Sequence, residues 1–210
     1  MTAETLPSLI MLTLRSPAEA ARALIARNLP MNTRWMALIV AVSLSALMNW
    51  VLTRMLAPEV SPEAAAASPM MTLSSQPLLL AAMQFGAVVT TAALMDGVGR
   101  VFGGRGNFAD ALLLVTWIEV MLLVVQILQV VFLMILPPLA ALMGLIALVL
   151  FVGLTVIFTK TLHGFESTLK VVFGVLMTAI AAVFVLSFIA AAFGVLPGMP
   201  NGAMPGAPQP

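Results

Sequence analysis

Residues 97–129 read GVGRVFGGRGNFADALLLVTWIEVMLLVVQILQ. A glycine-rich turn that carries Arg100 and Arg105 leads into a very apolar helix. This helix holds Glu119, Gln126 and Gln129 in a stretch that is otherwise apolar enough to cross a membrane. The stretch therefore predicts a small polytopic membrane protein, in which we expect the other spans to pack around this helix.

The composition of the chain requires lipid as its solvent. Hydrophobic residues make up 62% of the chain and charged residues 8%, whereas soluble domains contain about 25% charged residues. A net charge of +1 provides no basic patch for nucleic acid, and the chain has no cysteine. With one histidine, His163, and no recognisable catalytic or zinc motif, the sequence predicts neither an enzyme nor a cofactor.

Five apolar runs predict five transmembrane helices, because each is close to the roughly twenty residues that a span needs. We therefore predict an all-α polytopic membrane helical bundle over residues 35–195. Pro137-Pro138 predicts a tight hairpin between the third and fourth spans, because two prolines stop a helix. The predicted spans are Trp35–Leu56, Leu78–Val101, Ala111–Leu136, Leu139–Phe158 and Leu169–Val195.

The two ends of the chain have a different character. We predict a cytoplasmic arm over residues 1–34 and a disordered tail rich in proline and glycine over residues 196–210. In the arm, Ser16-Pro17-Ala18-Glu19 is typical of a capping box that opens an amphipathic helix. We expect this helix to lie in the membrane interface with its arginines toward anionic headgroups. Docking of the helix on the bundle is the alternative.

Lysine and arginine are distributed unequally between the two sides of the predicted bundle. One side holds eight of these residues and the other holds only Arg54. Because positive loops stay in the cytoplasm, we predict a cytoplasmic N-terminus and an external C-terminus. The eight residues are Arg15, Arg22, Arg27, Arg34, Arg100, Arg105, Lys160 and Lys170.

Glu119 is the most informative single residue of the chain. If its helix enters the membrane near Ala111, Glu119 lies roughly 12 Å deep at about 1.5 Å per residue. An ionised carboxylate at this depth is costly, so we expect the side chain to face the bundle interior, either paired or protonated. One reading is that Glu119, Gln126 and Gln129 form a polar pathway. The other is that they make hydrogen bonds between helices, as buried polar residues commonly do in membrane bundles.

The predicted cytoplasmic face provides further candidates. The spacing of Asp96 and Arg100 favours a local ion pair. Gly103-Gly104-Arg105-Gly106 lacks the ending of a phosphate-binding loop, so we attribute its glycines to a sharp turn. After this turn, Asn107 and Asp110 predict a capped helix start. The candidate interaction residues on this face are Arg22, Arg100, Arg105, Asp110, Lys160 and His163.

Several features together resemble bacterial members of the Yip family, the Ypt/Rab-interacting multispan membrane proteins. They are the SPAEAARALI arm helix, five spans, the GGRGNFADALLL turn, the PP hairpin and the LHGFES loop at Leu162–Ser167. The resemblance extends from Ser16 to Val195. It implies an integral-membrane scaffold or adaptor and supplies no catalytic residue. Eukaryotic members act in membrane traffic through small GTPases, but the short arm here has no evident long GTPase-binding region.

Taken together, we expect a non-enzymatic scaffold or interaction protein of a bacterial inner membrane, with its C-terminus in the periplasm. Its expected partners are the lipid bilayer and either another membrane protein or a second copy of itself, without nucleic acid. Two alternatives stay open. One is a small transporter or channel that uses Glu119, Gln126 and Gln129, and the other is an accessory subunit of a larger membrane complex.

Overall fold

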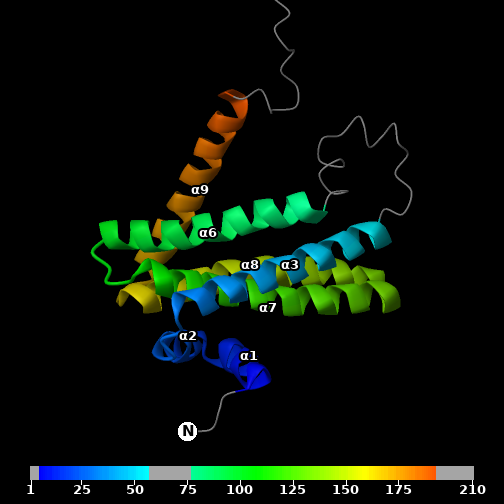
Figure 1. Cartoon of the computed structure of the whole chain (residues 1–210), viewed down its shortest axis with the longest axis horizontal. Coiled ribbons are helices and arrows are strands. Elements are labelled where there is room, and N and C mark those ends of the chain that lie inside the picture. The colour runs from blue at the N-terminus through cyan, green and yellow to red at the C-terminus, as the bar shows by residue number, and fades with distance from the viewer. Residues whose placement is uncertain (1–4, 57–76, 193–210) are drawn as a thin grey trace, which may run out of the picture.

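Seven helices and no strand make up the described part of the chain, residues 5–56 and 77–192 of a computed structural model (Figure 1). This confirms the all-α prediction. The helices are α1 (Leu6–Arg15), α2 (Pro17–Ala26), α3 (Met31–Leu56), α6 (Pro77–Val101), α7 (Phe108–Ile135), α8 (Pro137–His163) and α9 (Thr168–Ala192). The predicted disordered tail over residues 196–210 lies outside the described residues.

Helix α7 is the centre of the bundle. It packs against α3, α6 and α8, which run beside it in Figure 1. Every residue from Ala111 to Ile118 is buried, so this segment meets neighbours on all sides. A helix that is apolar all round and surrounded by other helices is the core element of a bundle. The prediction that other spans pack around this stretch is therefore confirmed for these three helices.

Four helices of the described chain, α3, α6, α7 and α8, are long and apolar enough to cross a membrane. Helix α9 has 25 residues, and the part of it whose side chains are described, Thr168–Phe184, is apolar. Figure 1 shows α9 leaving the bundle at a steep angle, and Val171 is the only buried residue among its described side chains. The chain is thus a multi-pass membrane protein by composition and fold, and its fifth span stays a prediction.

The predicted hairpin between the third and fourth spans is confirmed. Helix α7 ends at Ile135 and α8 begins at Pro137, so that Leu136 alone connects them. Both prolines lie in the first turn of α8, where a backbone N–H has no helical partner and its loss costs little. The short connection makes α7 and α8 antiparallel neighbours along their length.

The arm contains two helices where the sequence predicted one. Ser16 separates α1 from α2, and its backbone N–H donates to the carbonyl oxygen of Leu12 at 2.7 Å. The Ser16 side chain makes no capping hydrogen bond, so the predicted capping box was wrong. The reason is that Ser16 ends α1 as well as starting α2. Its φ of −144° and ψ of 72° are not the extended conformation that directs a capping hydroxyl at the helix.

The apolar face of the arm packs on the bundle. Ala20, Ala21 and Leu24 are at most 3% exposed, and α2 contacts α7 and α8. The face that we expected to rest on the membrane is thus covered by protein, as in the docking alternative. On the opposite face, Glu19 and Arg22 are exposed.

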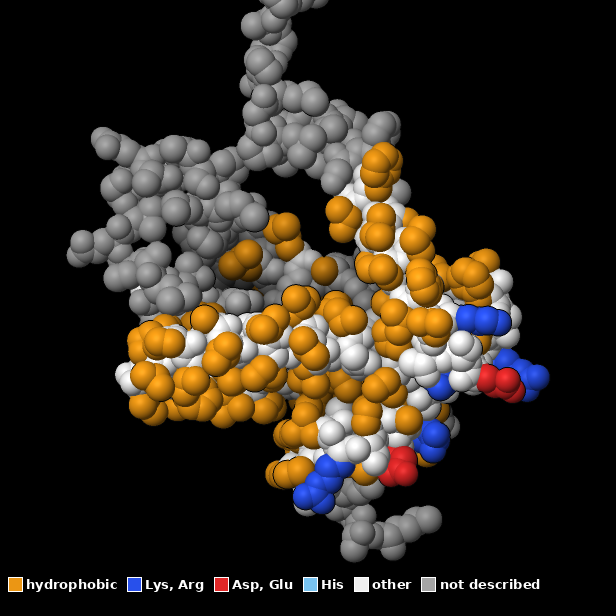
Figure 2. All heavy atoms as spheres, turned by 180° about the vertical axis from the view of Figure 1, so that it is seen from behind, with side chains coloured by type: hydrophobic (Ala, Val, Ile, Leu, Met, Phe, Trp, Pro, Cys, Tyr) orange, Lys and Arg blue, Asp and Glu red, His pale blue; other side chains and the backbone are white. Residues whose placement is uncertain are grey.

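Charged side chains collect at one end of the molecule. We call this the charged end: the end where α3 and α7 begin and α6 and α8 finish, with Arg34, Arg100, Asp110, Lys160 and His163. Figure 2 shows charges at this end and on the α1–α2 arm, whereas the remaining described surface of that view is mostly apolar. This separation is what a lipid-exposed bundle with one wet, charged end requires.

Candidate functional site

His163 joins three segments at the charged end. It is the last residue of α8 and is 3% exposed. The backbone N–H of Gly106 donates to its Nδ1 at 3.1 Å, and its Nε2 lies 2.9 Å from the carbonyl oxygen of Met95. Because a backbone N–H can only donate, Nδ1 is the acceptor and the ring proton is assigned to Nε2. A neutral imidazole with both nitrogens bonded therefore connects α8 to α6 and to the α6–α7 turn.

Three glycines give this ring its space. A Cβ added to Gly99, Gly104 or Gly106 would lie under 3.0 Å from atoms of the His163 side chain. No other residue type fits at these positions while the ring stays in place. We had attributed the glycines of the turn to its sharpness, and that reason holds for Gly103, whose φ is +83°. The spacing of these glycines in the sequence does not indicate that a histidine packs against them.

Asp110 is the centre of a second group of hydrogen-bonded residues at the charged end. Its Oδ1 accepts from Nη1 of Arg34 at 2.7 Å, while Nε of Arg34 donates to the Leu29 carbonyl at 2.8 Å. The predicted cap is confirmed, because Asn107 Oδ1 accepts from the Asp110 N–H at 2.9 Å. The Arg34 side chain is only 4% exposed. Sequence analysis used Arg34 for orientation alone and missed its role in tying α3 to α7.

The predicted pair of Asp96 and Arg100 is also confirmed. Nη2 of Arg100 lies 2.7 Å from Oδ2 of Asp96. The two side chains differ sharply in exposure, at 61% for Arg100 and 6% for Asp96. Oδ1 of Asp96 is buried and has no hydrogen-bond partner among the described residues.

The remaining candidates lie around these groups. Nζ of Lys160 donates to Oγ1 of Thr168 at 2.7 Å, which links the end of α8 to the start of α9. Arg105 is exposed in the turn and Arg22 is exposed on α2, and neither has a partner within the described chain. The charged end thus has an interior held by hydrogen bonds and ion pairs, and exposed cations on its surface.

Glu119 lies inside the bundle and pairs with a residue that sequence analysis did not select. Nε2 of Gln84 on α6 donates to Oε2 of Glu119 at 2.9 Å. Oε1 of Gln126 is buried without a partner among the described residues, and Gln129 faces Gly144 of α8. The structure therefore joins Glu119 to Gln84 rather than to either glutamine of its own helix.

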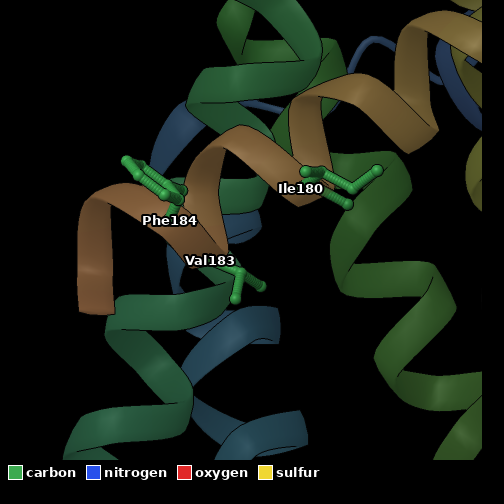
Figure 3. Close-up of a pocket in the computed structure, with 4 residues that line it drawn as sticks. Ile180, Val183 and Phe184 are labelled. Carbon is green, nitrogen blue, oxygen red and sulfur yellow. The ribbon is translucent and has the colours of Figure 1, made fainter. Parts of the chain in front are cut away.

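Two shallow hollows on the described surface are apolar. One, of about 360 Å³, is lined by Ala179, Ile180, Val183 and Phe184, all from α9 (Figure 3). The other, of about 420 Å³, is a groove between the arm and α8. Within residues 5–56 and 77–192, no cluster of three or more His, Cys, Asp or Glu side chains could hold a metal ion.

The chain matches a known protein family over most of its length. Residues 11–190 match the family described as the Yip1 domain, a span that runs from α1 into α9. No curated protein and no solved structure matches the chain.

Proposed function

Because the chain belongs to the Yip1 domain family, we propose that it is a membrane interaction protein without catalytic activity, which binds a partner at its charged end. One observation carries this proposal. The interior of the charged end is tied together by His163 and by the Arg34–Asp110 pair, while Arg105 stays exposed and unpartnered in the turn that they hold. Because the turn is held in place and Arg105 is exposed without an ion-pair partner in the described chain, this surface is suited to bind an acidic surface of another protein.

A second exposed cation supports this assignment. The Nζ of Lys170 at the start of α9 has no partner in the described chain, and the side chain is exposed. The proposed partner is a membrane protein or a second copy of this chain with a complementary acidic surface. We propose that the charged end faces the cytoplasm, because lysine and arginine gather on that side, and that the membrane is a bacterial inner membrane.

Copurification tests the proposal. We expect wild-type protein in a mild detergent to elute with one stoichiometric partner, identified by mass spectrometry. Arg105→Glu with Lys170→Glu should reduce recovery of that partner about tenfold, as expected when like charges meet at an interface. Arg54→Glu is the matched control, because Arg54 is exposed at the opposite end of α3. Equal recovery by the double variant and the control would contradict the proposal.

The same experiment addresses the accessory-subunit alternative. An accessory subunit should elute with several chains in a fixed ratio, whereas a free-standing scaffold should not. If several chains persist through the charge reversal at Arg105 and Lys170, the accessory-subunit assignment replaces the scaffold.

A transporter or channel is the second candidate function. It is favoured by the Gln84–Glu119 pair between α6 and α7, together with buried side-chain oxygens of Ser45, Thr116 and Gln126 that have no partner in the described chain. Flux of protons or solutes into proteoliposomes tests it with Glu119→Gln and Glu119→Leu. If wild type shows no flux, or both variants keep it, transport through this pair is excluded.

A further inference from the structure

The groove between the arm and α8 has the form of a lipid site. On one side it is lined by Thr13, Leu14 and Pro17, at the corner between α1 and α2. On the other it is lined by residues of α8 from Leu145 to Ile157. The floor contains Gly153, where an added Cβ would meet nothing within 4 Å. The groove is therefore an open, apolar surface hollow of about 420 Å³ along α8.

With the charged end at the membrane interface, the position of the groove along α8 corresponds to the hydrocarbon of one leaflet. Ile157 lies one helical turn before Lys160 at the charged end, and Leu145 lies far from it. The distance from Leu145 to Ile157 is roughly 18 Å at about 1.5 Å per residue. One leaflet of the hydrocarbon core is about 15 Å thick, half of roughly 30 Å. The groove thus has the length of an acyl chain that reaches from the interface to the midplane.

Several side chains that line the groove are exposed rather than covered by protein. On α8, Leu145 is 59% exposed and Val149 is 65% exposed. On the arm, Leu14 is 57% exposed, although its helix is attached to the bundle through buried Leu9 and Thr13. Apolar side chains with this exposure in a multi-pass protein are in contact with acyl chains. A groove among them offers one such chain contacts on two sides, from the arm and from α8.

A cation directly follows one of the residues that line the groove. Arg15 lies between Leu14 and Pro17 in the sequence, ends α1 and is exposed. It has no ion-pair partner within the described residues. Arginine binds phosphate with paired, charge-assisted hydrogen bonds. The geometry points to one anionic phospholipid as the occupant, with an acyl chain in the groove and its headgroup phosphate on Arg15.

Lipid titration tests this assignment on the full chain. The protein is purified in a mild detergent and titrated with palmitoyl-oleoyl phosphatidylglycerol, and bound lipid is counted by native mass spectrometry. Wild type should hold one phosphatidylglycerol more tightly than phosphatidylcholine. Gly153→Phe should fill the floor of the groove and lower the affinity for phosphatidylglycerol about tenfold, since each displaced methylene costs affinity. Gly86→Phe is the matched control, because Gly86 on α6 also has open space around it.

A second variant tests the headgroup contact without touching the packing. Arg15→Gln should abolish the preference for phosphatidylglycerol over phosphatidylcholine and leave the melting temperature unchanged, because the side chain is exposed. Three results would overturn the proposal. They are equal binding by Gly153→Phe and Gly86→Phe, an unchanged lipid preference in Arg15→Gln, and tighter lipid binding after deletion of residues 193–210, which would assign the groove to the tail.

Discussion

The backbone N–H of Gly106 donates to Nδ1 of His163 at 3.1 Å, across 57 residues of sequence. Together with the bond between Nε2 and the carbonyl oxygen of Met95, it fixes the α6–α7 turn to the end of α8. Phe165 stacks on the imidazole with ring centroids 5.4 Å apart. The turn that presents Arg105 is therefore positioned by a buried side chain from another helix, and not by its glycines alone.

Removal of the imidazole should destabilise the charged end. We expect His163→Ala to lower the free energy of unfolding by about 2–4 kcal/mol, because it leaves a cavity and an unpaired Gly106 N–H. Thermal melting in detergent measures the loss. Glu166→Gln is the control, since Glu166 is exposed in the same loop and should change stability by at most about 0.5 kcal/mol. Equal melting temperatures for the two variants would show that His163 does not stabilise the charged end.

The glycines around the ring should be coupled to it. Gly99→Ala should cost about 1–3 kcal/mol, because the new methyl group overlaps the imidazole. In a His163→Ala background the same change should be nearly neutral, which gives a coupling energy of up to about 3 kcal/mol in a double-mutant cycle. Gly97→Ala on the same helix is the control, since nothing lies within 4 Å of its added Cβ. Additive effects of Gly99→Ala and His163→Ala would show that the two positions are independent.

The buried ion pair between α3 and α7 should respond strongly to loss of its cation. Arg34→Ala should cost about 3–5 kcal/mol, because Asp110 stays partly buried without its charge partner. Arg34→Lys should be intermediate, since an ammonium restores the charge without the fixed second bond to Leu29. Arg54→Ala, which removes an exposed arginine from the same helix, should cost under about 1 kcal/mol. Chemical unfolding of all three variants checks this order, and an Arg34→Ala protein as stable as Arg54→Ala refutes it.

The arm should open when its hydrogen bond to α7 is removed. Nε1 of Trp117 donates to Oγ1 of Thr13 at 2.8 Å, and both side chains are buried. Thr13→Val leaves the indole N–H unpaired at a cost of about 1–3 kcal/mol, which raises the population of locally detached arm. Trypsin should then cleave at Arg22 faster than in wild type. Ser8→Ala, on the exposed side of α1, should leave the cleavage rate unchanged; the same rate in both variants would argue against this contact.

Inside the membrane, Glu119 should behave as one half of a hydrogen-bonded pair. Glu119→Gln keeps an acceptor for Gln84 and should change stability little. Glu119→Leu leaves the Gln84 amide without its partner, and we expect a loss of about 1–2 kcal/mol, in the range of hydrogen bonds between membrane helices. Gln84→Leu in the Glu119→Leu background should restore part of the loss. Melting curves in detergent distinguish this pattern from one in which Glu119→Gln and Glu119→Leu are equally stable.

The features that the sequence predicts correctly are those whose deciding contacts are local. Hydropathy over about twenty residues predicts α3, α6, α7 and α8, because a helix that crosses the hydrocarbon core must be apolar along that length. The Asn107 cap and the Asp96–Arg100 pair each join residues at most four apart. The failed capping box at Ser16 is local too, but it was decided by α1, whose start at Thr5-Leu6-Pro7 was not recognised in the sequence.

The contacts that build the charged end could not be predicted from residue spacing. Arg34 and Asp110 are 76 residues apart, and Thr13 and Trp117 are 104 apart. In each case the partner depends on how the helices pack and not on any repeat in the sequence. A single histidine and a run of glycines have many structural uses, and only the packed bundle brings Gly99, Gly104 and Gly106 to the His163 ring.

Site-specific photocrosslinking tests partner binding at the charged end most directly. A benzophenone side chain is placed at Arg105, in the turn, or at Met134, which is 74% exposed at the opposite end of α7. After illumination of intact cells, we expect a discrete protein adduct from position 105 and none from position 134. Absence of an adduct at 105, or equal adducts at both positions, would contradict the assignment of this chain as an interaction protein that works through its charged end.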